Sequence, residues 1–173
     1  MGQGVQSVEA DERVKVQIND QRLESDVALA AIGLKPQVSL AASAGLDVGV
    51  GVIVNQYGQT SNPDIYALGD CAEVCGLLRF YVAPLRICAQ AVAKNILGVE
   101  EKIHYQPMPV MMKTPSYPIC FCFKDRPEDW QVNAYDDGIA ALAYEGEQLV
   151  GFALSGSQMS QRMELKKQMV DWL

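Results

Sequence analysis

Residues 60–72 read TSNPDIYALGDCA, and the interpretation of the rest of the chain starts from this stretch. Asn62-Pro63-Asp64 has the composition of a turn, and the apolar residues 65–68 predict a short buried strand. The Gly69-Asp70 pair follows at the carboxyl end of that strand. Because glycine has no side chain, a ligand can approach the backbone there, and the Asp70 carboxylate can accept hydrogen bonds from hydroxyl groups. The alternative is an aspartate that only serves a turn or caps a helix.

The segments on either side of this stretch predict a mixture of helices and strands. Upstream, residues 40–46 predict a short helix ended by Gly45, and residues 51–55 predict a strand. Downstream, residues 84–97 predict an amphipathic helix with Gly98 beyond its end. Its expected apolar face comprises Leu85, Cys88, Ala89, Val92, Ala93 and Ile96.

The start of the 84–97 helix lacks the side chains that usually cap a helix. Tyr81, Val82 and Ala83 include no serine, threonine, aspartate or asparagine. The first backbone N–H groups of the helix therefore have no local side-chain acceptor. Either water or a bound ligand must satisfy them.

The first 36 residues predict three strands followed by a junction. The strands are expected at residues 5–8, 14–18 and 26–32, with a turn at 19–21. Three such strands form no independent core, so they are either a small meander or the last part of a larger domain. Gly33 and Pro36 combine a permissive backbone position with a fixed one, as a junction between domains requires.

The composition changes after residue 101 to short strands separated by turns. Strands are expected at 108–113, 119–123, 131–135, 139–144 and 149–154, and a final helix at 158–173. This pattern predicts a β-meander closed by a helix, a small domain of its own. The methionines of the final helix, Met159, Met163 and Met169, are interpreted as core residues.

The composition excludes several classes of function. The chain has 173 residues, 49% of them hydrophobic and 20% charged, with a net charge of −7. The sequence pI near 4.7 argues against nucleic acid as a partner, and no apolar run is long enough to span a membrane, so we expect a soluble cytoplasmic protein. The five cysteines and one histidine match no metal-binding pattern, and we expect no metal site and reduced thiols. The sequence assigns no role to Cys71, Cys75, Cys120 or Cys122.

The stretch TSNPDIYALGD closely resembles the second flavin-binding motif of the FAD-dependent pyridine nucleotide-disulfide oxidoreductases. The order AGL (44–46), GVIVN (51–55) and IYALGD (65–70) is also that of the family, and residues 26–36 resemble the junction between its NAD(P)H and FAD domains. The resemblance covers roughly residues 5–98. It implies that Gly69 and Asp70 contact the ribityl chain of FAD. It also implies that the helix start at Val82, Ala83 and Pro84 faces the pyrimidine edge of the flavin, favouring its reduced anion.

The VMMKTP segment (110–115) is similar to a segment of rubredoxin reductases in which a lysine lies beside the flavin. The resemblance implies this role for Lys113, and a solvated strand lysine is the alternative. Basic residues also gather between Arg79 and Arg126. A basic face would attract rubredoxin, a small acidic iron protein, although scattered surface charge explains the same residues.

No G-x-G-x-x-G fingerprint follows a strand in this sequence, whereas the family carries two. We therefore expect an α/β protein that represents the carboxyl-terminal part of a reductase with two dinucleotide-binding domains. Residues 1–34 would end the NAD(P)H domain, 35–104 would be the second half of the FAD domain, and 105–173 a third, interface domain.

The implied activity is FAD-dependent electron transfer from NAD(P)H to rubredoxin, in which the cofactor performs the chemistry and no catalytic side chain is needed. The chain alone is expected to be inactive and to bind FAD weakly or not at all. A ferredoxin or flavorubredoxin reductase is an alternative within the same family. A non-enzymatic remnant that self-associates through exposed strand edges is a further alternative.

Overall fold

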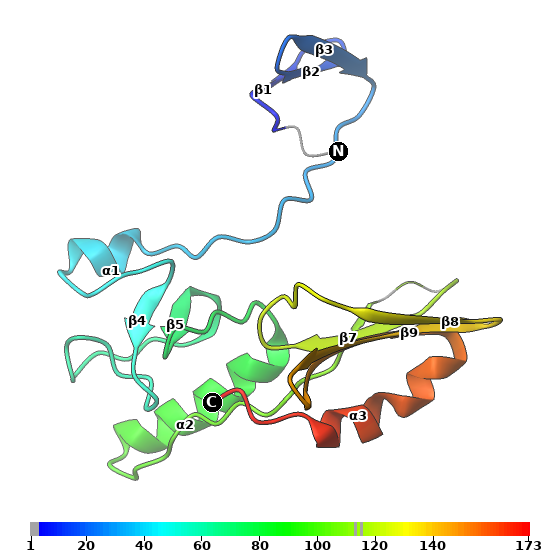
Figure 1. Ribbon diagram of the computed structural model, residues 1–173. Coiled ribbons are helices and arrows are strands. Elements are labelled where there is room, and N and C mark those ends of the chain that lie inside the picture. The colour runs from blue at the N-terminus through cyan, green and yellow to red at the C-terminus, as the bar shows by residue number, and fades with distance from the viewer. Residues whose placement is uncertain (1–3, 113, 115) are drawn as a thin grey trace. The chain divides into compact units, whose positions relative to one another are not determined.

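The computed structural model describes residues 4–112, 114 and 116–173, so Lys113 lies outside the described residues. The chain divides into two compact units, Met1–Leu34 and Lys35–Leu173. Each unit is described by itself, and Figure 1 shows their helices and strands.

The first unit contains a three-stranded antiparallel sheet in the order β1-β2-β3, formed by Ser7–Ala10, Val14–Ile18 and Gln21–Ser25. The predicted third strand at 26–32 is wrong. Asn19 adopts a positive φ of 50°, which permits a tight turn at residues 19–20. Ile18 and Gln21, on either side of this turn, pair with each other. The third strand therefore starts earlier, and the apolar run after it stays outside the sheet, with Leu29 and Ile32 90% and 94% exposed.

The second unit begins with helix α1 (Ser39–Ser43) and a short parallel pair of strands, β4 (Val52–Val54) and β5 (Ala72–Val74). The helix and strand predicted at 40–46 and 51–55 are confirmed. The strand predicted at 65–68 is wrong, because Tyr66 makes only one isolated bridge, to Gln59. β5 occupies the edge of β4 instead, and its alternation places Ala72 and Val74 in the core. Gly69–Cys71 forms the 3-10 turn η1, which precedes a strand rather than following one.

Helix α2 extends over Val82–Ile96, beginning two residues before its predicted start. Its buried face consists of Pro84, Cys88, Ala91 and Val92. The predicted apolar face was therefore wrong in part, since Leu85, Ala89, Ala93 and Ile96 are exposed. Positions 84, 88, 91 and 92 lie on one face of the helix. This face packs against the core, and the adjacent face that was predicted from the sequence is exposed in part.

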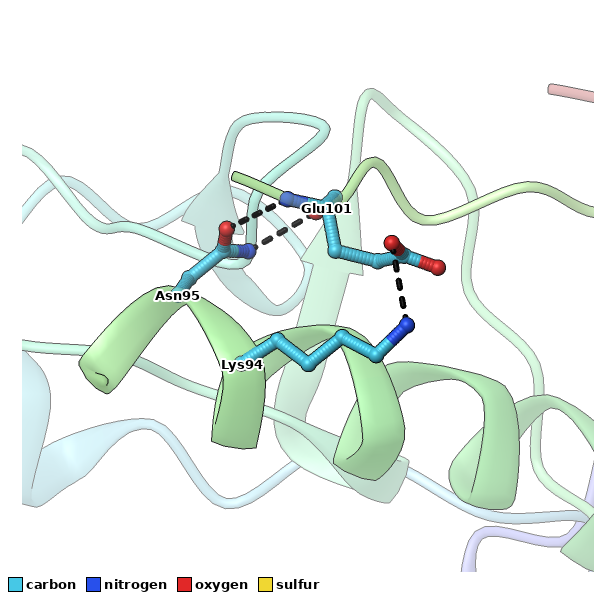
Figure 2. A network of polar contacts seen from close by, with 3 residues as sticks. All are labelled: Lys94, Asn95 and Glu101. Carbon is cyan, nitrogen blue, oxygen red and sulfur yellow. Dashed lines mark hydrogen bonds and ion pairs between the residues drawn. The ribbon is translucent and has the colours of Figure 1, made fainter. Parts of the chain in front are cut away.

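The carboxyl end of α2 is fixed by Asn95 (Figure 2). Its Nδ2 donates to the carbonyl oxygens of Tyr57 and Glu101, and its Oδ1 accepts from the Glu101 amide. Beside it, Lys94 Nζ forms an ion pair with Glu101 at 3.1 Å. The helix thus ends in a network that joins two loops.

A five-stranded antiparallel sheet follows, in the order β6-β7-β10-β9-β8. Its strands are Val110–Met112, Ile119–Phe123, Gln131–Tyr135, Gly138–Glu145 and Gln148–Ser155 in chain order. The positions of the strands were predicted correctly. The predicted β-meander is wrong, because the strands are not arranged in chain order. After β7 the chain crosses to the far edge at β8 and returns through β9, so the last strand, β10, lies at the centre beside β7.

The final helix is shorter than predicted. A 3-10 turn, η2 (Gly156–Gln161), leads into α3 (Arg162–Gln168), which packs on β10 and lies along the sheet in Figure 1. The last residues are extended: Met169 bridges Leu149, and Trp172 and Leu173 donate to the carbonyl oxygen of Tyr105. The extended tail lets the large side chain of Trp172 enter the core, which explains the early end of the helix. Met169 is buried, whereas Met163 is 53% exposed and is not a core residue.

One hydrophobic core runs through the second unit. Val54, Val74 and Cys88 from its first part share this core with Cys122, Phe152 and Trp172 from its last part, and Ile103 and Tyr105 lie between them. Among the described residues, no helix is both long enough and apolar enough to cross a membrane.

Candidate functional site

The Gly69 turn packs against the first turns of α2. Gly69 has a φ of +80°, and a Cβ atom placed on it would lie 3.1 Å from Cδ1 of Leu85. One helical turn after Leu85, Cys88 is buried on the face of α2 that packs into the core. The left-handed backbone favours glycine here, and a larger residue would also have to displace the end of the Leu85 side chain. The neighbouring Asp70 side chain is exposed.

Among the residues that the structure describes, no side chain caps the amino end of α2, as the sequence predicted. Tyr81 occupies the N-cap position in an extended conformation, and the first turn contains no acidic residue. Val82 and Ala83 are exposed, and Pro84 is buried and has no N–H group. Backbone donors and the positive end of the helix dipole are therefore available to a ligand at this point.

A cavity of about 240 Å³ lies between the segment leading into α2 and strand β7. Much of its wall is aromatic, and Phe121 and Phe123 stack with ring centroids 5.4 Å apart. The other aromatic lining residues are Phe80, Tyr81 and Trp172. Aromatic walls beside uncapped helix donors suit a planar ring that carries carbonyl groups and takes up negative charge.

A second cavity, of about 490 Å³, lies between α1 and residues 65–68. Its wall is largely apolar and includes Leu68 and Cys71, which flank the Gly69-Asp70 pair. Asp70 thus lies in a turn between this cavity and the amino end of α2. The structure brings Gly69, Asp70 and the start of α2 into one region, and Lys113 lies outside the described residues.

The described thiols are all free, and Cys71 and Cys75 are less buried than the three thiols of the core. Cys75 is exposed, in a turn with a positive φ of 47°, and Cys71 is half-buried. Burial raises the pKa of Cys88, although hydrogen bonds from Tyr105 and the Gly69 backbone oppose the shift. Burial, together with Cys120, raises the pKa of Cys122 to about 12, so this thiol stays protonated.

The contacts of two residues near the site were not predicted from the sequence. The Tyr105 hydroxyl lies 2.8 Å from Sγ of Cys88 beneath α2. Arg79 lines the aromatic cavity and contacts both Lys124 and Trp172. No local pattern indicates either contact, because the partners are separated by 17, 45 and 93 residues in the sequence.

Comparison with known proteins establishes the family. A sequence profile described as pyridine nucleotide-disulphide oxidoreductase matches residues 1–103, more than half of the chain. The chain belongs to the pyridine nucleotide-disulphide oxidoreductase family. A second profile, described as rubredoxin binding C-terminal domain, matches residues 102–169.

Curated members of the family are similar to this oxidoreductase chain over most of its length. It is 42% identical over 151 residues to the rubredoxin-NAD(+) reductase of Alcanivorax borkumensis, covering 86% of this chain and 40% of that protein. It is 40% identical over 152 residues to the nitric oxide reductase FlRd-NAD(+) reductase of Salmonella arizonae, with the same coverage. The chain thus spans about 40% of the length of these relatives.

Solved structures confirm the predicted fold class of this oxidoreductase chain. A ferredoxin reductase from Rhodopseudomonas palustris matches with a TM-score of 0.75 at 23% identity, over 94% of this chain and 43% of that one. NADH:rubredoxin oxidoreductase from Clostridium acetobutylicum matches with a TM-score of 0.68 at 23% identity, over 80% of this chain and 37% of that one. At these identities the likeness establishes the mixed α/β fold alone.

The basic stretch predicted as a docking face is partly engaged in internal contacts. Lys94 is paired with Glu101, and Lys102 lies over the ring of Tyr57, 6.0 Å from its centroid. Arg79 is half-buried against Trp172. These three residues of the oxidoreductase chain therefore do not form one freely exposed basic surface.

Proposed function

We propose that this chain forms the flavin-facing and acceptor-facing part of an FAD-dependent NAD(P)H oxidoreductase that passes electrons to rubredoxin. The observation that carries the proposal is the uncapped amino end of α2, which lies beside the Gly69 turn and an aromatic cavity. The family profile and the rubredoxin-binding profile support the same function.

Each site residue has a distinct role in this proposal. The Asp70 carboxylate accepts hydrogen bonds from the ribityl hydroxyls, and Gly69 lets the chain of the cofactor approach the backbone. The backbone N–H groups of Val82 and Ala83 donate to the flavin carbonyls, and Pro84 holds the first turn of the helix in place. Lys113 adds positive charge near the ring. The flavin supplies the redox chemistry, accepting hydride and releasing single electrons.

The proposal assigns the three regions of the chain to three tasks. Residues 1–34 belong to the NAD(P)H domain, 35–104 to the FAD domain, and 105–173 to the interface with the electron acceptor. Rubredoxin is the proposed acceptor because residues 102–169 match the rubredoxin-binding profile. We further propose that the reductase acts in the cytoplasm.

A flavorubredoxin is the second candidate acceptor. It is favoured by the Salmonella relative, which is a nitric oxide reductase FlRd-NAD(+) reductase at nearly the same identity as the rubredoxin reductase. The ferredoxin reductase resemblance rests on the fold alone and supports no acceptor. The exposed apolar run at 26–32 supports the non-enzymatic alternative, in which the chain self-associates.

A chimera tests the proposal. The segment of the Alcanivorax rubredoxin-NAD(+) reductase that aligns with this chain would be replaced by the aligned 151 residues of this chain. The purified protein would be examined for bound FAD and for NADH-dependent reduction of rubredoxin and flavorubredoxin. We expect flavin to be bound and rubredoxin to be reduced. We also expect Asp70→Ala to weaken FAD binding by about tenfold or more, through the loss of charge-assisted hydrogen bonds.

A folded chimera that binds no flavin, or that binds flavin but reduces neither acceptor, would contradict the proposal. The 173-residue chain alone should bind FAD weakly, and gel filtration at several concentrations would show whether it self-associates. Asp64→Ala, in the preceding turn, provides the control for a general effect of removing a carboxylate from this segment.

A further inference from the structure

We propose that Arg79 is a positioning residue that holds the carboxyl-terminal tail and the end of β7 against the start of α2, and so fixes the wall of the aromatic cavity. This role deepens the proposed function, and its importance for flavin binding rests on that function. Arg79 lies two residues before the N-cap of α2, so its main chain belongs to the segment that leads into the helix.

The guanidinium of Arg79 makes contacts in three directions. Nη1 donates to the carbonyl oxygen of Leu78 at 2.9 Å, and Nη2 donates to the carbonyl oxygen of Lys124, also at 2.9 Å. Its central carbon lies 5.0 Å from the centroid of the Trp172 ring. A planar fork of donors that also stacks on an indole is a combination that arginine provides and lysine does not.

The two partners of Arg79 come from separate parts of the cavity wall. Lys124 directly follows β7, and Trp172 belongs to the extended tail; both line the same cavity as Arg79. Trp172 is 5% exposed, and its amide donates to the carbonyl oxygen of Tyr105. The tail is therefore held by main-chain hydrogen bonds on one side and by the Arg79 guanidinium on the other.

The position of the Arg79 charge supports the same role. Its Nε atom is buried and has no hydrogen-bond partner among the described residues. Burial raises the pKa of Tyr81 at the N-cap of α2, and the positive charge of Arg79 opposes that shift. Arg79 and Tyr81 both line the cavity, so the cation lies beside the helix start, where its charge adds to the positive end of the helix dipole.

Hydrogen exchange of the 173-residue chain tests the structural part without any ligand. Arg79→Met removes the donors and the charge but keeps an unbranched side chain of similar reach, and Arg79→Lys keeps the charge and N–H donors but not the planar fork that stacks on Trp172. We expect the Tyr105 and Trp172 amides to exchange about tenfold faster or more in Arg79→Met, and Arg79→Lys to restore only part of the protection. Arg86→Met, an exposed arginine on α2, is the matched control and should leave these amides unchanged.

The chimera tests the functional part. There we expect Arg79→Met to weaken FAD binding by about tenfold while Arg86→Met leaves it unchanged, because a displaced wall no longer orders the ligand site. Unchanged exchange of the tail in Arg79→Met would overturn the proposal, and so would a released tail with unchanged flavin affinity. An unsubstituted chimera that binds no flavin would instead overturn the proposed function. Hydrogen exchange of the Tyr105 and Trp172 amides would then decide the positioning role by itself.

Discussion

The hydroxyl oxygen of Tyr105 lies 2.8 Å from Sγ of Cys88, in the core between α2 and the carboxyl-terminal sheet. The main chain of Tyr105 also pairs with the last two residues of the chain. One residue therefore connects the helix that carries the proposed flavin site with the tail that closes the sheet. Through this contact, the two matched sequence profiles meet in a single core.

Tyr105→Phe should reduce the free energy of unfolding by about 1 kcal/mol, because it removes one buried hydrogen bond while keeping the packed ring. Denaturant unfolding monitored by circular dichroism would measure the change. Tyr135→Phe is the control, since Tyr135 is 51% exposed. Equal stabilities for the two variants would show that the Cys88–Tyr105 contact contributes nothing measurable.

Alkaline pH should destabilise the folded chain. The pKa of Cys122 rises from an ordinary 9.0 to about 12 on folding, and burial raises the pKa of Tyr105 as well. A raised pKa means that the folded state holds its proton where the unfolded state releases it. Each such group therefore stabilises the folded state fully below about pH 9. This stabilisation decreases as pH rises toward the pKa of the folded state, by up to about 1.4 kcal/mol per pH unit per group.

Unfolding by urea at several pH values between about 8 and 11 would measure this slope. Cys122→Ala removes one of the titrating groups, so its stability should decrease less steeply with pH, even if it starts lower because of the smaller side chain. A parallel pH dependence for the parent chain and Cys122→Ala would contradict the assignment to this thiol.

Gly69→Ala should lower stability by about 1–3 kcal/mol, because the positive φ is strained for alanine and the new methyl group would press on Leu85. Gly76→Ala is a matched control: Gly76 has a φ of +81°, but no atom lies within 4 Å of the added Cβ. The difference between the two variants in thermal unfolding isolates the Leu85 contact. If Gly76→Ala were as unstable as Gly69→Ala, the positive φ alone would explain the loss of stability in Gly69→Ala.

Asn95→Ala should cost about 2–4 kcal/mol, since three partly buried hydrogen bonds at the end of α2 are lost together. Lys94→Ala, its neighbour, removes only an ion pair whose side chains are 51% and 44% exposed, and should cost less than about 1 kcal/mol. Chemical denaturation of both variants provides the comparison. A larger loss for Lys94→Ala would reverse this interpretation of Figure 2.

Local chemistry made parts of the fold predictable from the sequence. Alternation between polar and apolar residues located β2 with its observed bounds, and short runs between turn residues located β7 and β8. Gly45 and the missing cap before α2 are single-residue features, and they were recognised correctly. The family was identified from a run of adjacent residues, which requires no knowledge of long-range contacts.

The errors occurred where tertiary contacts decide between similar local options. Residues 65–68 are as apolar as a strand, yet β5 occupies the edge of β4 that they would need. The last five residues continue a helical pattern, but burial of Trp172 and pairing with Tyr105 favour an extended tail. The roles of Arg79 and Tyr105 likewise depend on partners distant in sequence, which no local pattern contains.

The central position of β10 has a consequence for synthesis of the chain on the ribosome. β7 ends at Phe123 and pairs with β6, which precedes it, but β10, its neighbour on the other side, ends only at Ser155. At about 5–20 residues per second, β7 waits on the order of seconds for its partner. During this interval its apolar residues are available to chaperones and to other nascent chains. The yield of folded protein should therefore depend on the translation rate across residues 124–155, through synonymous codons that leave every contact in the native structure unchanged.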